Sequence, residues 1–380
     1  MTLYLGLMSG TSMDGVDAVL ARFSAGPPTP MVVLGHLHLD MPAALRSELM
    51  ALNAAGAGEL HRAALAGNGL ARLCAEASLT LLAQAGVAAE QVRAMGAHGQ
   101  TVRHRPGEFD GIGYTIQLLN GALLAELSGI DVVCDLRSRD VAAGGQGAPL
   151  VPAFHAALWS KAGEARAVLN LGGIGNLSLL HADGTVGGFD CGPGNALMDL
   201  WCERHRGQPF DTDGAWAAGA EFDPGWLSCL LSEPYFKRQP PKSTGRDLFH
   251  GAWLEQKLGH ASAQGLSPQQ IQATLAELTA CSAAQALREH APATTRLWVC
   301  GGGALNTHLM QRLAAGLPGV QVQSTGDLGL PPLQVEAAAF AWLAQAFVQG
   351  QAGNRHEVTG AAGPRVLGAL HPSGKRRQPG

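Results

Sequence analysis

The chain carries one pattern of elements twice: an apolar strand, a turn rich in glycine and polar residues, and a second apolar strand. The first copy, Leu5 to Phe23, reads LGLMSGTSMDGVDAVLARF. The second, Ala167 to Asn195, reads AVLNLGGIGNLSLLHADGTVGGFDCGPGN and adds another turn, which carries an aspartate. A third glycine turn lies in LWVCGGGALNTHLMQRL, Leu297 to Leu313, between a strand and a helix. Turns so far apart in sequence can meet only where two domains face each other.

An α/β protein of two domains is therefore expected. The chain has 380 residues, more than one hydrophobic core usually supports. Apolar residues at helical spacing fill residues 42–86, and strands are predicted at Leu3 to Met8 and Val16 to Phe23. Val92 to Val102 is predicted to be a buried strand that runs into a glycine turn. Strands thus alternate with helices along the chain.

The domain limits follow from this alternation. The first domain is predicted to contain residues 1–140 and about 345–380, and the second to contain 141–344. The helix predicted at Val335 to Val348 would return the chain to the first domain.

Composition excludes several classes of function. The net charge is -4 and the only basic run is GKRRQPG at the C-terminus, so no nucleic-acid partner is expected. The seven cysteines are scattered without a C-x-x-C pair, which is typical of reduced thiols in the cytoplasm. The start of the chain lacks the pattern of a signal peptide. The most apolar run, VEAAAFAWLAQAFV, is too short to span a membrane. A cytoplasmic protein is expected.

The first turn, Ser9 to Gly15, has the composition of a phosphate-binding turn. Its glycines allow close approach to the backbone, and its hydroxyl and N–H groups can donate hydrogen bonds to phosphate oxygens. Carboxylates would repel a bound phosphate unless a divalent cation lay between them, so Asp14 or Asp17 could hold Mg²⁺. A capped hairpin turn without any ligand remains the alternative.

Two later turns fit the same chemistry. NLGGIGN presents the amides of Asn170 and Asn176 around Gly172 and Gly173, and CGGGALN places glycines 301–303 at the start of a helix, where a nucleotide can bind. Close packing of the helix on its strand would explain those three glycines equally well. No G-x-x-x-x-G-K-[ST] motif occurs, and no Rossmann pattern follows the first strand, so ATP would need another fold.

Motifs along the whole chain carry a family resemblance. They are, in order, MSGTSMDGVD, AHGQTVRH, NLGGIGN, GFDCGPGNALMD, STGRDLF, CGGGALN and VTGAAGPRVLG. Together they resemble the motifs of anhydro-N-acetylmuramic acid kinases. The resemblance implies the actin, Hsp70 and hexokinase fold, with two related ribonuclease H-like domains and an ATP cleft between them. It also implies Mg²⁺ as a cofactor and a homodimer.

The resemblance further implies the reaction. Family members convert 1,6-anhydro-N-acetylmuramic acid and ATP to N-acetylmuramic acid 6-phosphate during cell-wall recycling. A carboxylate base must activate the water that opens the anhydro bridge, and the freed 6-oxygen then attacks the γ-phosphorus. Asp190, in GFDCGPGN, is expected to be this base. Without the family match, a role in capping the turn or in holding Mg²⁺ would be favoured.

The other expected site residues follow from the motifs. Those expected to bind ATP are Gly10, Thr11, Ser12, Met13, Asp14, Gly15, Val16, Asp17, Asn170, Gly172, Gly173, Asn176, Gly301, Gly302 and Gly303. Those expected to bind the sugar are His98, Gln100, Thr101, His104, Arg137, Asp190 and Glu336.

For two of the residues expected to bind the sugar, a purely structural role remains an alternative. Arg137 either neutralises the lactyl carboxylate of the sugar or pairs with Asp135 or Asp140. Glu336 is either a helix N-terminal charge or an acceptor for sugar hydroxyls.

Two other functions remain as alternatives. One is a kinase of the same fold that acts on a free 6-hydroxyl. The other is an ATP-driven binding module like actin or Hsp70. A serine hydrolase is disfavoured, because neither Ser9 nor Ser12 lies in a G-x-S-x-G motif.

Overall fold

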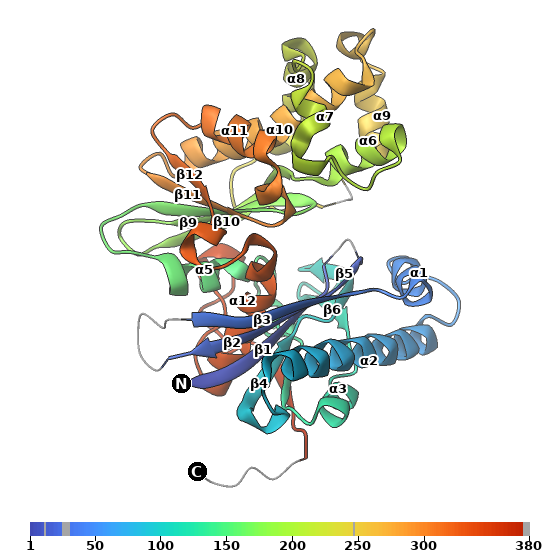
Figure 1. Ribbon diagram of the computed structural model, residues 1–380, viewed down its shortest axis with the longest axis vertical. Coiled ribbons are helices and arrows are strands. Elements are labelled where there is room, and N and C mark those ends of the chain that lie inside the picture. Colours follow the sequence, from blue (N-terminus) through green and yellow to red (C-terminus); the bar gives the residue numbers. More distant parts are fainter. Residues whose placement is uncertain (11–12, 25–30, 246–247, 375–380) are drawn as a thin grey trace. The chain divides into compact units, whose positions relative to one another are not determined.

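The structure, a computed structural model, describes residues 1–10, 13–24, 31–245 and 248–374. Contacts divide the chain into two compact units, Met1–Leu158 with Gln334–Gly380, and Trp159–Leu333. Each unit contains a mixed β-sheet and its helices (Figure 1). The predicted domain limits, 1–140 with 345–380 and 141–344, stay a prediction, because compactness alone does not show which segments fold independently.

The first unit is built from strands and helices at both ends of the chain. Its strands are β1 (Thr2–Met8), β2 (Gly15–Phe23), β3 (Met31–Asp40), β4 (Val92–Ala97), β5 (Gln100–Pro106), β6 (Gly113–Leu118), β7 (Val132–Cys134) and β13 (Ala369–His371). Its α-helices are α1 (Ala43–Ala51), α2 (Glu59–Ala85), α3 (Gly121–Ser128), α4 (Ser138–Ala142), α5 (Val151–Trp159), α12 (Val335–Val348) and α13 (His356–Thr359).

The second unit is one continuous segment. Its strands are β8 (Arg166–Leu171), β9 (Ile174–Leu180), β10 (Val186–Pro193), β11 (Arg296–Cys300) and β12 (Gln321–Ser324). Its α-helices are α6 (Ala196–Arg206), α7 (Ala215–Ala218), α8 (Pro224–Leu231), α9 (Gly251–Leu258), α10 (Pro268–His290) and α11 (Thr307–Ala315). Short 3-10 helices in the chain include η3 (Pro234–Lys237) and η5 (Gly302–Leu305).

The two sheets share one topology. The first unit has the order β3-β2-β1-β4-β7, with β13 beyond β7, and the second has β10-β9-β8-β11-β12. In each sheet the first three strands of the unit pair antiparallel, and the two later strands join in parallel. The repeat read from the sequence is therefore a repeat of structure. The predicted α/β class with two related units is confirmed.

Helices α12 and α2 cover opposite faces of the first sheet. A Cβ at Gly6 would overlap the carbonyl oxygen of Ala337, and one at Gly96 would overlap that of Phe340, so the backbone of α12 lies directly on β1 and β4. Because side chains alternate along a strand, Leu5 and Leu7 point away from α12. They join the core that α2 lines. The predicted helix at Val335 to Val348 is confirmed in its bounds.

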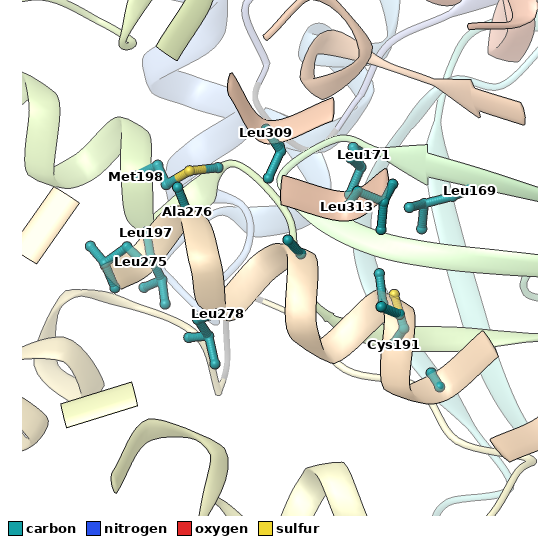
Figure 2. Packing of buried hydrophobic residues seen from close by; sticks show 14 of the residues in the cluster. Leu169, Leu171, Cys191, Leu197, Met198, Leu275, Ala276, Leu278, Leu309 and Leu313 are labelled. Carbon is teal, nitrogen blue, oxygen red and sulfur yellow. The ribbon is translucent and has the colours of Figure 1, made fainter. Parts of the chain in front are cut away.

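Helix α10 forms the centre of the second unit. Residues 271–280 are all buried, and the helix packs against β9, β10 and four neighbouring helices. Figure 2 shows Leu275, Ala276 and Leu278 of this helix near Leu197 and Met198 of α6. The core therefore lies on the face of the sheet that carries Leu169 and Leu171.

Two expectations from composition can be compared with this structure. Within the described part of the chain, no helix is long and apolar enough to cross a membrane. All seven cysteines are free, and five of them are buried.

Candidate functional site

The turn between β1 and β2 is only partly described, because Thr11 and Ser12 lie outside the described residues. The N–H of Met13 donates to the carbonyl oxygen of Gly10, with N and O 3.2 Å apart, and Met13 has a φ of 53°. The side chains of Met13 and Val16 are buried in the core. Any contact of these two residues with ATP would thus involve their backbone groups.

The acidic residues of this turn differ in their surroundings. Asp14 is exposed. The Oδ1 atom of half-buried Asp17 lies 2.9 Å from Nε2 of His36 and 3.1 Å from Nδ1 of His38, both on β3. Among the described residues, no group of three or more His, Cys, Asp and Glu could hold a metal. Mg²⁺ bound with ATP needs only one or two carboxylates, so Asp14 or Asp17 as its ligand stays a prediction.

Buried polar contacts join the end of β1 to the start of β5. The hydroxyl of Ser9 donates to Oε1 of Gln100 over 2.6 Å, and Nε2 of Gln100 donates to the carbonyl oxygen of Gly10 over 3.2 Å. His98 donates from Nδ1 to the carbonyl oxygen of Ser9 over 3.0 Å. The predicted residues His98 and Gln100 therefore brace the first turn.

Arg137 completes this cluster. Its Nη2 and Nε lie 2.9 and 3.3 Å from Nε2 of His98, and its Nη1 donates to the carbonyl oxygen of Gly147 over 2.8 Å. Because Nδ1 of His98 already carries a proton, its Nε2 is the acceptor. Burial, followed by the charge of Arg137, lowers the pKa of His98 to about 3. The imidazole is therefore neutral near pH 7.

Glu336 acts on the same guanidinium. Burial lowers the pKa of Arg137 to about 10, and the charges of Glu336 and Asp140 oppose that shift. Glu336 is half-buried in the first turn of α12. The structure thus brings together four of the predicted sugar-side residues, His98, Gln100, Arg137 and Glu336, in the first unit.

Strand β5, which pairs with β6, carries Thr101 and His104, the other two sugar-side residues predicted in the first unit. Nδ1 of His104 lies 2.9 Å from Oγ1 of Thr115, and Nε2 of Gln117 donates to Thr115 and Thr101 over 2.7 and 3.2 Å. Oε1 of Gln117 is buried and has no hydrogen-bond partner among the described residues. Sequence reasoning missed Gln117 and Thr115, because the polar row becomes visible only once the two strands are paired.

In the second unit, three predicted residues form one row across the sheet. Asp190 on β10 pairs with Asn176 on β9, which pairs with Asn170 on β8. Residues directly opposite each other share a face of the sheet. Neighbouring residues such as Leu169 and Phe189 point to the core, so the polar row lies on the face opposite α10.

Asp190 is held by one segment outside the sheet. Its Oδ2 accepts the N–H of Thr244 over 2.9 Å, and its backbone oxygen accepts the hydroxyl of Tyr235 over 2.7 Å. Its own N–H donates to the carbonyl oxygen of Lys242 over 3.3 Å. A β-bulge follows directly, between Asp190 and Gly192. Bulges often aim a side chain beside an active site.

The electrostatics of Asp190 suit a base. Desolvation raises the pKa of its half-buried carboxyl to about 6, and the hydrogen bond from Thr244 partly opposes this shift. A carboxylate with a pKa close to the working pH can take a proton and later release it. The segment around Thr244 had only the STGRDLF motif as a signal, without an assigned role.

The predicted glycines of the second unit fall into two groups. A Cβ at Gly301 would overlap Leu171 and Asn170, and one at Gly303 would press on Leu171, so close packing explains both. Gly172 and Gly173 have space for a Cβ and ordinary φ values. Protein packing does not require glycine at these two positions, so close approach of ATP to them stays a prediction.

Asn170 has a buried oxygen whose hydrogen bonding is unexplained. It is 5% exposed, and its Oδ1 has no hydrogen-bond partner within the part of the chain that the structure describes. A buried acceptor without a partner costs free energy, so it usually has a functional explanation.

The sequence comparisons identify the family of the chain. A family model described as anhydro-N-acetylmuramic acid kinase matches residues 2–373. A protein of that name from Variovorax paradoxus (strain S110) is 60% identical over 376 residues, 98% of this chain and 99% of the relative. A further one from Cupriavidus metallidurans is 58% identical and covers 97% of each chain.

Solved structures are similar only at a coarse level. An activator of 2-hydroxyisocaproyl-CoA dehydratase from Clostridium difficile with bound ADPNP has a TM-score of 0.48 and 11% identity, with coverage of 92% of this chain and 96% of the other. A ROK hexokinase from Thermus thermophilus has a TM-score of 0.35 and 14% identity, with coverage of 90% and 100%. The assignment rests on the sequence matches: the chain belongs to the anhydro-N-acetylmuramic acid kinase family.

Proposed function

We propose that this protein is an ATP-dependent kinase of peptidoglycan recycling. It opens the bridge of 1,6-anhydro-N-acetylmuramic acid with water and phosphorylates the freed 6-oxygen, giving N-acetylmuramic acid 6-phosphate. Family membership supports the reaction. The observation that carries the mechanism is Asp190, a half-buried carboxyl with a pKa of about 6 that three groups of one segment hold in place.

Asp190 is the base in this proposal. Its carboxylate takes a proton from water as the water oxygen bonds to the anomeric carbon and the bond from that carbon to the 6-oxygen breaks. The 6-oxygen, gaining negative charge, then bonds to the γ-phosphorus while ADP leaves. One water and one ATP are consumed for each sugar.

Arg137 is proposed to bind the lactyl carboxylate of the sugar. Its contacts with His98 and Gly147 use three of the five N–H groups of a guanidinium. Because His98 stays neutral near pH 7, it accepts from Arg137 without repelling it. Glu336 is proposed to accept hydrogen bonds from sugar hydroxyls, and Gln100, Thr101 and His104 complete the polar lining.

ATP is proposed to bind at the predicted turns. Asn170, Gly172 and Gly173 are the strongest candidates, since packing does not explain the two glycines. Gly302 has more room than Gly301 and Gly303. Asp14 is the carboxylate best placed to hold Mg²⁺. When bound, this ion would neutralise charge on the phosphates.

The decisive test is Asp190→Asn. The variant should bind ATP with nearly wild-type affinity in calorimetry, while sugar-dependent ATP consumption falls by about 10²-fold or more. Near-normal turnover would remove Asp190 from the role of base.

A substrate comparison separates the alternatives. The wild-type protein should consume ATP with the anhydro sugar and not with N-acetylmuramic acid, whose 6-hydroxyl is free. Preference for the open sugar would establish the ordinary sugar kinase. Slow ATP hydrolysis that no sugar changes would establish the binding module.

A homodimer is the proposed assembly. The resemblance to the family supports it, and light scattering over a range of concentrations tests it. A mass of one chain at all concentrations would contradict the dimer.

A further inference from the structure

Asp140, on α4, is a fully buried carboxylate. It is 0% exposed. Its Oδ1 accepts Nδ2 of Asn354 over 2.7 Å and the hydroxyl of Thr359 over 2.8 Å, while its Oδ2 accepts the N–H of Gly147 over 2.8 Å. These three donors are neutral. Burying a carboxyl group is costly, and these hydrogen bonds and the nearby charge of Arg137 only partly offset that cost, so a carboxyl group at this position calls for a reason.

The loop 143–147 is shaped around this carboxylate. A Cβ at Gly145 would overlap Oδ2 of Asp140. Gly147 has a φ of 66°, and a Cβ there would lie 2.9 Å from Cγ2 of Val141. Both glycines are therefore required by the way the loop folds over Asp140.

Gly147 connects Asp140 to the sugar-side cluster. Its N–H donates to Asp140, and its carbonyl oxygen accepts from Nη1 of Arg137. A shift of this residue would therefore move the group that orients the guanidinium. His98 depends on the same guanidinium through Nε2.

The C-terminal segment fixes the loop from the other side. The N–H of Gln146 donates to the carbonyl oxygen of Thr359 over 2.7 Å, and that of Ala362 donates to the carbonyl oxygen of Ala143 over 2.8 Å. Asp140 thus joins the loop and the segment 354–362 at one point. Removing the acceptor would release both.

We infer that Asp140 is a positioning residue for sugar binding, which acts through Gly147 to hold Arg137 where it meets the substrate carboxylate. This inference rests on the proposed function. It assigns a role in substrate affinity to a side chain that does not reach the substrate.

Asp140→Asn tests the inference, because the amide nitrogen turns one acceptor into a donor that faces other donors. The KM for the sugar should rise by about tenfold or more, while the KM for ATP stays within about twofold. In an Arg137→Ala background the same substitution should add almost nothing to the KM for the sugar. An equal rise for both substrates, or a full effect in the Arg137→Ala background, would overturn the inference.

Two more variants separate positioning from stability. Thr359→Val removes one bond to Oδ1 and should give a smaller rise in the KM for the sugar. Ser128→Ala is the matched control, since it removes a buried bond from Ser128 Oγ to the carbonyl oxygen of Leu124 in the same unit. It should lower stability and leave both KM values unchanged. Equal effects of Thr359→Val and Ser128→Ala on the KM for the sugar would contradict the inference.

A measurement that does not depend on activity distinguishes the positioning role of Asp140 from the proposed function. In nitrogen-15 spectra, Asp140→Asn should shift the Nε2 resonance of His98 as Arg137 moves away, and Ser128→Ala should not. An unchanged His98 spectrum in Asp140→Asn refutes the positioning role, whatever the activity. A wild-type protein that shows the expected spectra but no sugar-dependent ATP consumption refutes the proposed function instead.

Discussion

Replacing Asp190 with asparagine should stabilise the protein in a pH-dependent way. Desolvation raises the pKa of this carboxyl from 3.8 to about 6. In the unfolded chain the carboxyl ionises at lower pH than in the folded protein. Between the two pKa values the unfolded chain therefore binds fewer protons, and the free energy of unfolding falls as pH rises.

The magnitude follows from the shift. Each pKa unit corresponds to about 1.4 kcal/mol, so the ionised carboxylate costs about 3 kcal/mol above pH 7 and about 1 kcal/mol at about pH 4.5. Asparagine has the same shape, cannot ionise and still accepts the N–H of Thr244. The free energy of unfolding of the variant should therefore exceed that of the wild type by up to these amounts. They are upper limits, because Asp190 is only half-buried and solvent screens part of its charge.

Urea unfolding of both proteins at the two pH values measures the effect. Six of the seven tryptophans lie in the second unit, so their fluorescence reports mainly on the unit that contains Asp190. The gain of Asp190→Asn should be larger at about pH 7.5 than at about pH 4.5, by up to about 2 kcal/mol. An equal gain at both pH values, or a loss at about pH 7.5, would refute desolvation as the cause of the raised pKa.

Three further changes have defined outcomes. Gln272→Leu should raise the free energy of unfolding by about 1–3 kcal/mol in urea titrations, because both polar atoms of this fully buried side chain have no hydrogen-bond partner among the described residues; a loss would show that the amide is satisfied. Gly6→Ala should lower the free energy of unfolding by about 3 kcal/mol, because the new Cβ would overlap the backbone of Ala337 in α12. A variant that unfolds at the same temperature as the wild type would contradict this contact. Asp14→Asn should raise the Mg²⁺ concentration needed for half-maximal ATP consumption more than Asp17→Asn does, because Asp14 is exposed while Asp17 is half-buried and contacts two imidazoles; the reverse order would indicate that the ion binds at Asp17.

Local pattern predicted much of the fold. Apolar runs marked β1 and β2 to within about a residue of their ends, and helix α12 has the predicted bounds. The repeated strand and turn pattern indicated two similar units, which the common strand order confirms. These features depend on neighbours in sequence, which is why one sequence suffices to find them.

Contacts between distant segments could not be predicted. Asp140 meets Asn354 and Thr359, which lie 214 and 219 residues further along the chain. No spacing rule connects residues so far apart. Asp140 looked like a partner for Arg137 in sequence. In the structure its charge does act on the guanidinium, and the hydrogen bonds between the two run through Gly147.

The sequence also could not sort glycines by their role. Gly172 and Gly301 looked alike, each in a glycine turn after a strand. Only the space around each position shows that packing requires Gly301 and leaves Gly172 open. The requirement for glycine comes from what lies opposite, and this is a property of three dimensions.

The path of the chain has a consequence for its synthesis. The first unit ends at Leu158 and resumes only at Gln334, with the helix that packs on Gly6 and Gly96. A ribosome must produce the whole of the second unit before this helix emerges, which takes on the order of ten seconds or more. Through that interval β1 and β4 lack the helix that covers them in the folded protein, so the first unit can complete its fold only after the second has been made.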